Sequence, residues 1–330
     1  MAEPSFDVVG IGNAIVDVLA HADDGFLAGH GLAKGAMTLV DGDRAKSLYG
    51  KIGPAVECSG GSAANTIAAL ASLGGRGAYI GKVHDDQLGE VFGHDMRAQG
   101  VHFDTPASRS GPPTATCLIL VTPDAQRTMQ TFLGACVELG PDDVDEDLIA
   151  AAHITYLEGY LWDPPEAKRA LVKAAKAARQ AGRRVALTLS DPFCVDRHRA
   201  EFLDLIERHV DILFANEHEI ISLYRVADFD GAMQAVRGHC EIAALTRSEK
   251  GSVIVRGDEI HVIDAERVAK VVDSTGAGDA YAAGFLFGVA SGMDLAQSAR
   301  VGGIAAAEVI SHIGARPDRP LKDLVRAKLG

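Results

Sequence analysis

The sequence lacks the features that mark secreted, membrane and disulfide-stabilised proteins. Its five cysteines are odd in number and widely spaced, with no Cys-x-x-Cys pair, which argues against a disulfide framework or a zinc knuckle and is typical of a reducing compartment. The start of the chain has neither the basic end nor the apolar run of a signal peptide. The longest uncharged apolar stretch, Ala280 to Met293, is too short to span a bilayer. We therefore expect a soluble, cytoplasmic protein with no membrane partner.

Basic residues are too few and too scattered to form a surface for polyanions. The formal net charge is −13, and Arg183-Arg184 is only a pair of adjacent arginines. A protein that binds duplex nucleic acid needs a strong local basic stripe to overcome such a charge, so we expect no nucleic-acid partner. Small anions such as ATP remain possible ligands, because backbone amides and a metal ion can hold phosphates without net positive charge.

Several common catalytic signatures are also missing. The chain has no His-Glu-x-x-His, no Gly-x-Ser-x-Gly and no Walker-A motif, and its twelve histidines show no metal-ligand spacing. Gly10-x-Gly12 follows a strand-like segment, as in a dinucleotide-binding fingerprint, but Ile15 occupies the position that requires a third glycine. We reject an NAD-binding interpretation on that ground.

What the chain does contain is an alternation of strand-like and helix-like segments. Glu166 to Ala181 is rich in alanine with apolar residues at helical spacing, and Gly182 follows where a C-terminal cap belongs. Val253 to Val262 reads as a hairpin around Gly257-Asp258. This rhythm predicts an α/β fold with a mostly parallel sheet covered by helices on both faces. Further expected strands are Val8–Ile11, Val185–Leu189, Asp211–Ala215 and Ile242–Leu245, and further expected helices are Thr66–Leu73, Phe202–His209, Ala280–Ala290 and Leu295–Ile310.

Two regions break this rhythm with short alternating runs, such as Thr114 to Val121. We expect them to pair into one small sheet that projects from the main body and covers a cleft. No Pro/Gly/Ser linker separates the parts, so the domains are expected to interleave in sequence. The expected large domain comprises residues 1–17, 58–104 and 132–330, and the expected small β lid comprises residues 18–57 and 105–131.

The segment Gly276-Ala277-Gly278-Asp279 immediately precedes an apolar helix. Glycines at a helix start let several backbone N–H groups point at one spot, and with the helix dipole they form an anion hole for a phosphoryl group. The same amides and dipole are expected to keep Asp279 ionised, as suits a carboxylate that accepts a hydroxyl proton. The alternative is a glycine-rich turn in which Asp279 merely begins a helix.

Two polar segments follow consecutive expected strands. Asn216-x-x-Glu219 places two oxygen-bearing side chains on one helical face, where they can order water around Mg²⁺, but the same spacing is a capping box, which the pattern alone favours. The segment Thr246-Arg247-Ser248-Glu-Lys-Gly251 fits either a nucleotide-binding loop or a plain connection between strands, and without context the plain connection is favoured.

Near the N-terminus, Asn13 and Asp17 follow the first expected strand, and a carboxylate is a good acceptor for the two protons of a vicinal diol; the alternative for Asp17 is an exposed loop residue. Gly60-Gly61 allows close approach of the backbone to a ligand, and Asn65 on the first helical turn offers both a donor and an acceptor. The alternative there is a tightly packed helix start.

The order of these motifs resembles that of the ribokinase-like (phosphofructokinase-B) carbohydrate kinase family, from about Val8 to Gly314. The resemblance implies a three-layer αβα sandwich with a small β-sheet lid, and phosphoryl transfer from ATP to an alcohol with Mg²⁺. A monovalent cation is a further candidate cofactor. It implies that Asp279 is the base and that Gly276, Ala277 and Gly278 form the anion hole. It also implies that Asn216 and Glu219 organise Mg²⁺ and phosphates through water. The implied nucleotide contacts are Thr246, Arg247, Ser248 and Gly251. The motifs are Gly12-Asn13…Asp17, Gly60-Gly61…Asn65, Gly81-Lys-Val-His-Asp-Asp86-x-x-Gly89, Asn216-x-x-Glu219 and Asp273-Ser-Thr-Gly-Ala-Gly-Asp279.

Within this family the sequence is most similar to adenosine kinases. The likeness rests on Gly12-Asn13, Gly-Gly-Ser62, Pro113-Thr-Ala-Thr-Cys117, Leu189-Ser-Asp-Pro-Phe193 and Asp211-Ile-Leu-Phe-Ala-Asn-Glu217. By that likeness Asp17, Gly61 and Asn65 hold the ribose diol. Arg127 closes over the phosphates, although by itself it reads as a solvated hairpin charge. The implied wall of the base pocket is Tyr160, Leu161 or Trp162.

Three residues depart from the family pattern: His84, Ser248 and Cys136. Ser248 replaces the second glycine of the Thr-x-Gly-x-x-Gly loop. We expect ATP-dependent phosphorylation of the 5′-hydroxyl of adenosine by a monomer or homodimer. The alternatives are a kinase of the same family that acts on ribose, fructose or another nucleoside, and a catalytically silent nucleoside-binding regulator.

Overall fold

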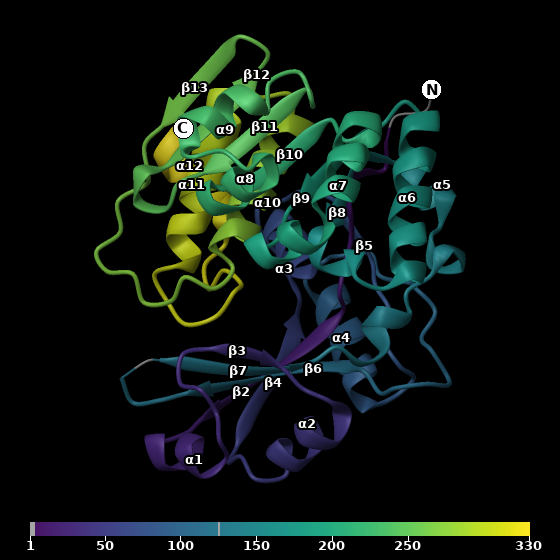
Figure 1. Ribbon diagram of the computed structural model, residues 1–330, viewed down its shortest axis with the longest axis vertical. Coiled ribbons are helices and arrows are strands. Elements are labelled where there is room, and N and C mark those ends of the chain that lie inside the picture. Colours follow the sequence, from purple (N-terminus) through teal and green to yellow (C-terminus); the bar gives the residue numbers. More distant parts are fainter. Residues whose placement is uncertain (1–3, 125) are drawn as a thin grey trace.

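A central sheet of eight strands forms the body of the protein (Figure 1). The computed structural model describes residues 4–124 and 126–330; residues 1–3 and 125, which fall within the expected large domain and lid, lie outside them. The strands from β5 to β11 in the sheet are parallel, and the β12–β13 hairpin adds two antiparallel strands at one edge. In spatial order the strands are β13 (Glu259–Ile263), β12 (Ser252–Arg256), β11 (Ile242–Thr246), β10 (Ile212–Asn216), β9 (Arg184–Thr188), β8 (Ala152–Glu158), β1 (Phe6–Ile11) and β5 (Gly77–Ile80).

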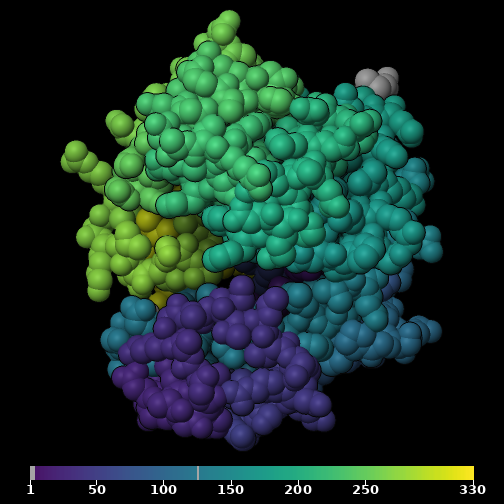
Figure 2. Space-filling view, viewed as in Figure 1, coloured from purple at the N-terminus to yellow at the C-terminus, as the bar shows by residue number. Residues whose placement is uncertain are grey.

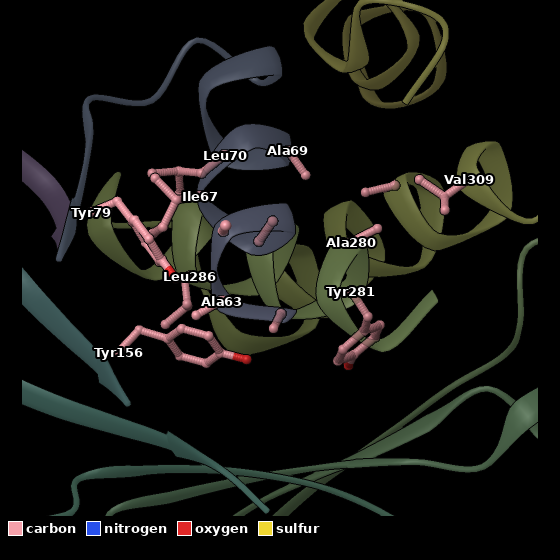
Figure 3. Close-up of a cluster of buried hydrophobic side chains, with 14 of the residues drawn as sticks. Ala63, Ile67, Ala69, Leu70, Tyr79, Tyr156, Ala280, Tyr281, Leu286 and Val309 are labelled. Atoms are coloured by element: carbon pink, nitrogen blue, oxygen red, sulfur yellow. The ribbon is translucent and has the colours of Figure 1, made fainter. Parts of the chain in front are cut away.

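Helices cover both faces of this sheet, because its strands carry apolar side chains toward both. Val8 belongs to one hydrophobic cluster and Val9 to another, as the alternation of side chains along a strand requires. Figure 3 draws part of the first cluster, where Ile67, Tyr79 and Leu286 are buried. The helices of the first face are α3 (Ser62–Ser72), α10 (Ala277–Ala290), α11 (Leu295–Val309) and α12 (Leu321–Leu329). Those of the second are α5 (Glu146–Ala150), α6 (Pro165–Gln180), α7 (Pro192–His209), α8 (Glu217–Tyr224) and α9 (Phe229–Ala235).

A second sheet of five strands projects from the body (Figure 1). Its outer face packs on two short helices, α1 (Asp24–Gly29) and α2 (Gly42–Tyr49), through alternate residues of β2 such as Val16 and Val18. Its other face looks toward the body, and Figure 2 shows the molecular surface hollowed between the two. The strands in spatial order are β3 (Met37–Leu39), β7 (Arg127–Phe132), β6 (Ala115–Val121), β2 (Ile15–His21) and β4 (Ala55–Gly60); α4 (Gln87–Ala98) packs beneath β4.

The α/β fold predicted from sequence, with a mostly parallel sheet between two helical layers and a small second sheet, is confirmed. The β12–β13 hairpin turns at Gly257, which has a positive φ of 57°. Three helices begin several residues earlier than predicted: α3 at Ser62, α10 at Ala277 and α7 at Pro192, where α7 is capped by Asp191 and contains a kink at His198. The strands of the small sheet also extend beyond residues 18–57, since β2 begins at Ile15 and β4 ends at Gly60. No helix in the described part of the chain is long and apolar enough to cross a bilayer.

Candidate active site

The motifs singled out in the sequence converge where the small sheet faces the body. Parallel strands present their carboxyl ends at one edge of a sheet, where ligands of α/β proteins bind. Glu158 ends β8, Asn216 ends β10 and Thr246 ends β11 at this edge. The N-termini of α3 and α10 reach the same place, since Ser62 of α3 donates a hydrogen bond to Asp279 of α10.

The start of α10 is built as an uncapped helix terminus. Gly276 has φ 78°, and a Cβ there would lie 2.5 Å from the carbonyl oxygen of Ala315, so only glycine fits. Within residues 4–124 and 126–330, no side chain caps the first amides of the helix by a hydrogen bond. A Cβ at Gly278 would meet nothing within 4 Å. The amide of Ala277 donates to the carbonyl oxygen of Ser274 at 3.3 Å, so the amides of Gly278 and Asp279 are the ones left to serve as donors to an anion.

The carboxylate of Asp279 is held by two side chains from α3. Ser62 Oγ donates to Oδ1 at 2.6 Å, and Asn65 Nδ2 lies 3.5 Å from Oδ2. Burial raises the pKa of Asp279 to about 6, while the hydrogen bonds from Ser62 and Asn65 and the charge of Arg316 act in the opposite direction. The prediction that helix amides hold this carboxylate ionised is therefore wrong. Desolvation raises its pKa, and the groups that oppose this effect are the side chains of Ser62, Asn65 and Arg316.

Asp17 faces Asp279 from the small sheet. Burial raises the pKa of Asp17 to about 6, the charge of Asp279 adds to this, and Arg316 and Arg127 lower it. The neighbouring strand makes room for this carboxylate at Gly60, where a Cβ would lie within 2.4 Å of Asp17 Oδ2. Asp17 thus lies next to Gly60 and close enough to Asp279 for the two carboxylates to affect each other's charge.

The turn that precedes α3 packs directly against the end of β1. Gly61 has φ 96°, and a Cβ there would lie 2.1 Å from the carbonyl oxygen of Asn13. The side chain of Asn13 is 4% exposed and donates from Nδ2 to Glu158 Oε1 at 2.7 Å. Glu158 Oε2 accepts the amide of Ala63 at 2.9 Å. The Asn13 side chain, predicted to bind hydroxyls, here anchors the turn to β8.

Sequence inspection missed three residues of this network: Ser62 as a partner of Asp279, Glu158 and Arg316. Burial raises the pKa of Glu158 to about 7, against hydrogen bonds from Ala63 and Asn13. These residues contact partners more than 90 positions away in the sequence. A Glu at a strand end or an Arg in a C-terminal loop carries no local signature, so only the tertiary structure identifies them.

On the other side of the site, Asn216 and Glu219 form a capping box at the start of α8. Asn216 Oδ1 accepts the amides of His218 and Glu219, both at 2.9 Å, and Glu219 accepts the amide of Asn216 at 2.8 Å. Burial raises the pKa of Glu219 to about 7. The capping interpretation that the spacing favoured is confirmed.

The loop after β11 contains Ser248, the residue that replaces a glycine of the family's Thr-x-Gly-x-x-Gly pattern. Ser248 adopts φ 52°, a left-handed conformation that glycine tolerates better than serine. Gly251 has φ 83°, and a Cβ there would lie 2.0 Å from the carbonyl oxygen of Ile263. Arg247 is engaged elsewhere: it donates to Glu217 at 3.2 Å and stacks on Phe229 with 4.0 Å between guanidinium and ring centre.

Arg127 of β7 links the small sheet to the loop that precedes α10. Its Nη2 lies 2.8 Å from Asp273 Oδ2, and the two side chains are only 8% and 7% exposed. Asp273 also accepts hydrogen bonds from Thr275 and from the amide of Gly314. Arg127 is therefore a buried ion-pair partner in this structure and not a solvated hairpin charge.

Of the three residues predicted to wall a base pocket, two face away from the site. Leu161 and Trp162 are buried in the hydrophobic cluster beneath the second helical layer, and Trp162 Nε1 donates to Glu201 of α7 at 2.6 Å. They lie in a 3₁₀ turn, Gly159–Trp162, whose consecutive side chains point in different directions. Tyr160 alone is exposed, at 38%, so the prediction for Leu161 and Trp162 is wrong.

Comparison with known proteins agrees with this arrangement. The sequence pattern of the pfkB family carbohydrate kinases matches residues 45–322. The structure is similar to that of an adenosine kinase from Sinorhizobium meliloti (55% identity, TM-score 0.90, covering 98% of this chain and 99% of that one). It is equally similar to a probable sugar kinase from Rhizobium etli CFN 42 (51% identity, TM-score 0.91, 98% of both chains). The adenosine kinase of Saccharomyces cerevisiae is 27% identical over 97% of this chain and 99% of its own length. Given the match over most of its length, the chain belongs to the pfkB family of carbohydrate kinases and is a phosphotransferase.

Proposed function

We propose that this enzyme transfers the γ-phosphoryl group of ATP to the 5′-hydroxyl of a nucleoside, with adenosine as the preferred acceptor, giving AMP and ADP. The observation that carries the proposal is that three features meet at one place: a partly exposed carboxylate, Asp279; the uncapped helix start on which it lies; and a second carboxylate, Asp17, which faces it across the cleft.

The chemistry assigned to each feature follows from its charge and position. Asp279 is the general base that accepts the proton of the attacking hydroxyl. The amides at Gly278 and Asp279 stabilise the negative charge on the group in transfer. The small sheet is a lid whose closure excludes water, so that ATP is not hydrolysed. Arg127 contributes positive charge from the lid to the loop that carries these amides.

Asp17, Gly61 and Asn65 are the groups proposed to bind the ribose diol. Asp17 accepts hydrogen bonds from two hydroxyls. Asn65 Oδ1 already accepts from Arg316 at 3.1 Å, so its amide nitrogen is the part left to serve as a donor. Gly61 brings the backbone close, because no side chain fits there.

The preference for a nucleoside over a free sugar rests on the body-facing side of the lid. Leu19 lies two residues beyond Asp17 on the same face of β2, beside Ile119 of β6 and Met129 of β7. Such an apolar surface suits a flat base better than it suits a hydroxyl-rich sugar. The names of similar proteins do not decide between a nucleoside and a sugar, since one is called an adenosine kinase and another a probable sugar kinase. A kinase of ribose, fructose or another nucleoside is therefore the second candidate.

Magnesium fits this site only as a hydrated ion held with the phosphates. Both carboxylate oxygens of Glu219 already accept hydrogen bonds from Asn216, and the described residues include no cluster of three or more His, Cys, Asp or Glu that could hold a metal. We propose that Asn216 and Glu219 contact the ion through water, as predicted from the sequence. When bound, the ion neutralises charge on the ATP phosphates.

The test is a panel of acceptors with the purified enzyme, ATP and MgCl₂, measured as ADP formation and as phosphorylated product. Adenosine should give the highest kcat/KM among adenosine, other nucleosides, ribose and fructose. A higher kcat/KM for a free sugar would refute the nucleoside assignment. Nucleoside binding without any ATP consumption would identify a silent regulator instead. A purine-salvage role in the cytoplasm follows from the proposal only if adenosine is preferred.

A further inference from the structure

Arg316 lies in the segment between α11 and α12 and has no assigned role in the mechanism above. Its side chain is only 15% exposed, and its three guanidinium nitrogens contact partners from α3, β4 and α4. Nε donates to Asn65 Oδ1 at 3.1 Å, Nη1 to Ser59 Oγ and, at 3.3 Å, to Asp95 Oδ2, and Nη2 lies 3.5 Å from Met96 Sδ.

The contact with Asn65 determines which way its amide points. A guanidinium group has donors only, so the Asn65 atom that faces Arg316 must be the carbonyl oxygen. The amide nitrogen is thereby turned toward Asp279, where Nδ2 lies 3.5 Å from Oδ2. In the opposite orientation the Asn65 oxygen would face the carboxylate and repel it, and the nitrogen would face a cation.

Arg316 is itself held in place. Asp95 Oδ2 also accepts the amide of Ser59 at 2.8 Å, and its Oδ1 accepts Gln99 Nε2 at 3.0 Å. A planar guanidinium with several fixed partners loses little freedom when it binds one more. The preceding residue, Ala315, packs against Gly276 at the start of α10. One short segment thus touches both the anion hole and the group that orients the base.

The charges around Asp279 come from several elements. Arg316 opposes the effect of burial on the pKa of both Asp279 and Asp17, and Arg127 does so for Asp17. The other titratable groups coupled to Asp279 are Glu158, Tyr156 and Tyr160. Arg316 is therefore the positive charge that both carboxylates share.

We propose that Arg316 is a positioning residue for the phosphoryl transfer. It fixes the Asn65 amide with its nitrogen toward Asp279, and it supplies the positive charge that balances Asp17 and Asp279. This inference rests on the proposed function, because it assigns Arg316 a task in preparing the proposed base.

The experiment compares Arg316→Met, which removes both donor and charge, with Arg316→Lys, which keeps the charge. The matched control is Arg199→Met: Arg199 has a similar exposure, 16%, pairs with Asp196 of α7 and donates to the carbonyl oxygen of Ser222 on α8. Arg316→Met should lower kcat by about 10- to 100-fold and move the acid limb of the kcat/KM profile to higher pH. Arg316→Lys should keep the limb in place with reduced kcat, and Arg199→Met should leave both unchanged. Wild-type kcat and an unmoved limb in Arg316→Met would overturn the inference.

A double-mutant cycle tests whether Arg316 acts through Asn65. If it does, Arg316→Met lowers kcat much less in an Asn65→Ala background than in the wild type; full additivity would contradict this. If Arg316→Met does not fold, the same cycle is run with Arg316→Lys, where the buried charge beside Asp95 is kept.

A measurement without turnover separates this inference from the proposed function. The carbon-13 shift of the Asp279 carboxyl, identified by comparison with Asp279→Asn, is followed against pH in the folded wild type and Arg316→Met. A higher pKa in the variant supports the inference even if no acceptor is phosphorylated, in which case the proposed function alone fails. An unchanged pKa contradicts it even if the wild type is an active kinase.

Discussion

The two halves of the candidate site are assembled in different ways. The half proposed to bind the acceptor (the acceptor half), around Asp17 and Asn65, is joined by contacts between distant segments: Asn65 and Asp279 are 214 residues apart, and Asn13 and Glu158 are 145 apart. The half proposed to bind ATP (the ATP half) is built locally, since Asn216 and Glu219 are three residues apart. A local motif forms wherever its strand and helix form. The acceptor half forms only when distant segments of the body have folded together, and Asp17 adds a residue from the small sheet.

This difference predicts that substitutions in the acceptor half will separate catalysis from stability most clearly. Asp279→Asn keeps the size of the side chain and removes the proton acceptor. We expect kcat to fall by about 10²- to 10⁴-fold, the usual contribution of a general base, with the melting temperature and the binding of adenosine and ATP retained. Single-turnover kinetics together with calorimetric binding measure both. Turnover near that of the wild type would show that Asp279 is not the base.

Gly60→Ala should displace Asp17 in the acceptor half and leave the residues of the ATP half in place. The added Cβ lies 2.4 Å from Asp17 Oδ2, so the carboxylate must move, and a misplacement of this size costs about 10- to 100-fold in efficiency. We expect KM for the acceptor to rise while KM for ATP stays constant. Gly53→Ala is the control, because a Cβ there meets nothing within 4 Å. An equal rise in both KM values would mean that the two halves are not independent.

The comparison also explains what the sequence could predict. Continuous apolar runs located the strands of the body, because a parallel sheet covered by helices on both faces buries both sides of each strand, and apolar residues at helical spacing located its helices. Spacing identified the capping box of Asn216, and the glycines marked where a backbone approaches closely, as at Gly61. The partners of Asp279 and the side to which Leu161 and Trp162 point depend on tertiary packing, and no local pattern encodes them.

The pH dependence of kcat/KM should report the burial of the acceptor half. A base at the ordinary aspartate pKa of 3.8 would stay active down to about pH 4, whereas burial raises the pKa of Asp279 to about 6. A base works only when ionised, so kcat/KM should fall below pH 6, by about tenfold per pH unit. Asp17 has the same raised pKa, and protonation of both groups would give a steeper fall. A profile that stays flat to pH 4.5 would contradict the assignment.

The smallest effect is expected in the ATP half, at the departure from the family pattern. Ser248 has a left-handed backbone angle, φ 52°, which costs a non-glycine residue about 1–2 kcal/mol of folding stability, and Ser248→Gly removes this cost. Glycine also makes the unfolded chain more flexible, which lowers folding stability by about 0.4–1 kcal/mol. The melting temperature should therefore rise slightly or not at all, and KM for ATP should change by less than about threefold, since a local loop already holds its shape with serine. Gly251→Ala is the contrasting variant, because its Cβ would lie 2.0 Å from the carbonyl oxygen of Ile263 at φ 83°, and it should weaken ATP binding far more. If Ser248→Gly instead lowered KM for ATP tenfold, this loop would be tuned through its backbone strain, and the ATP half would be as sensitive to single residues as the acceptor half.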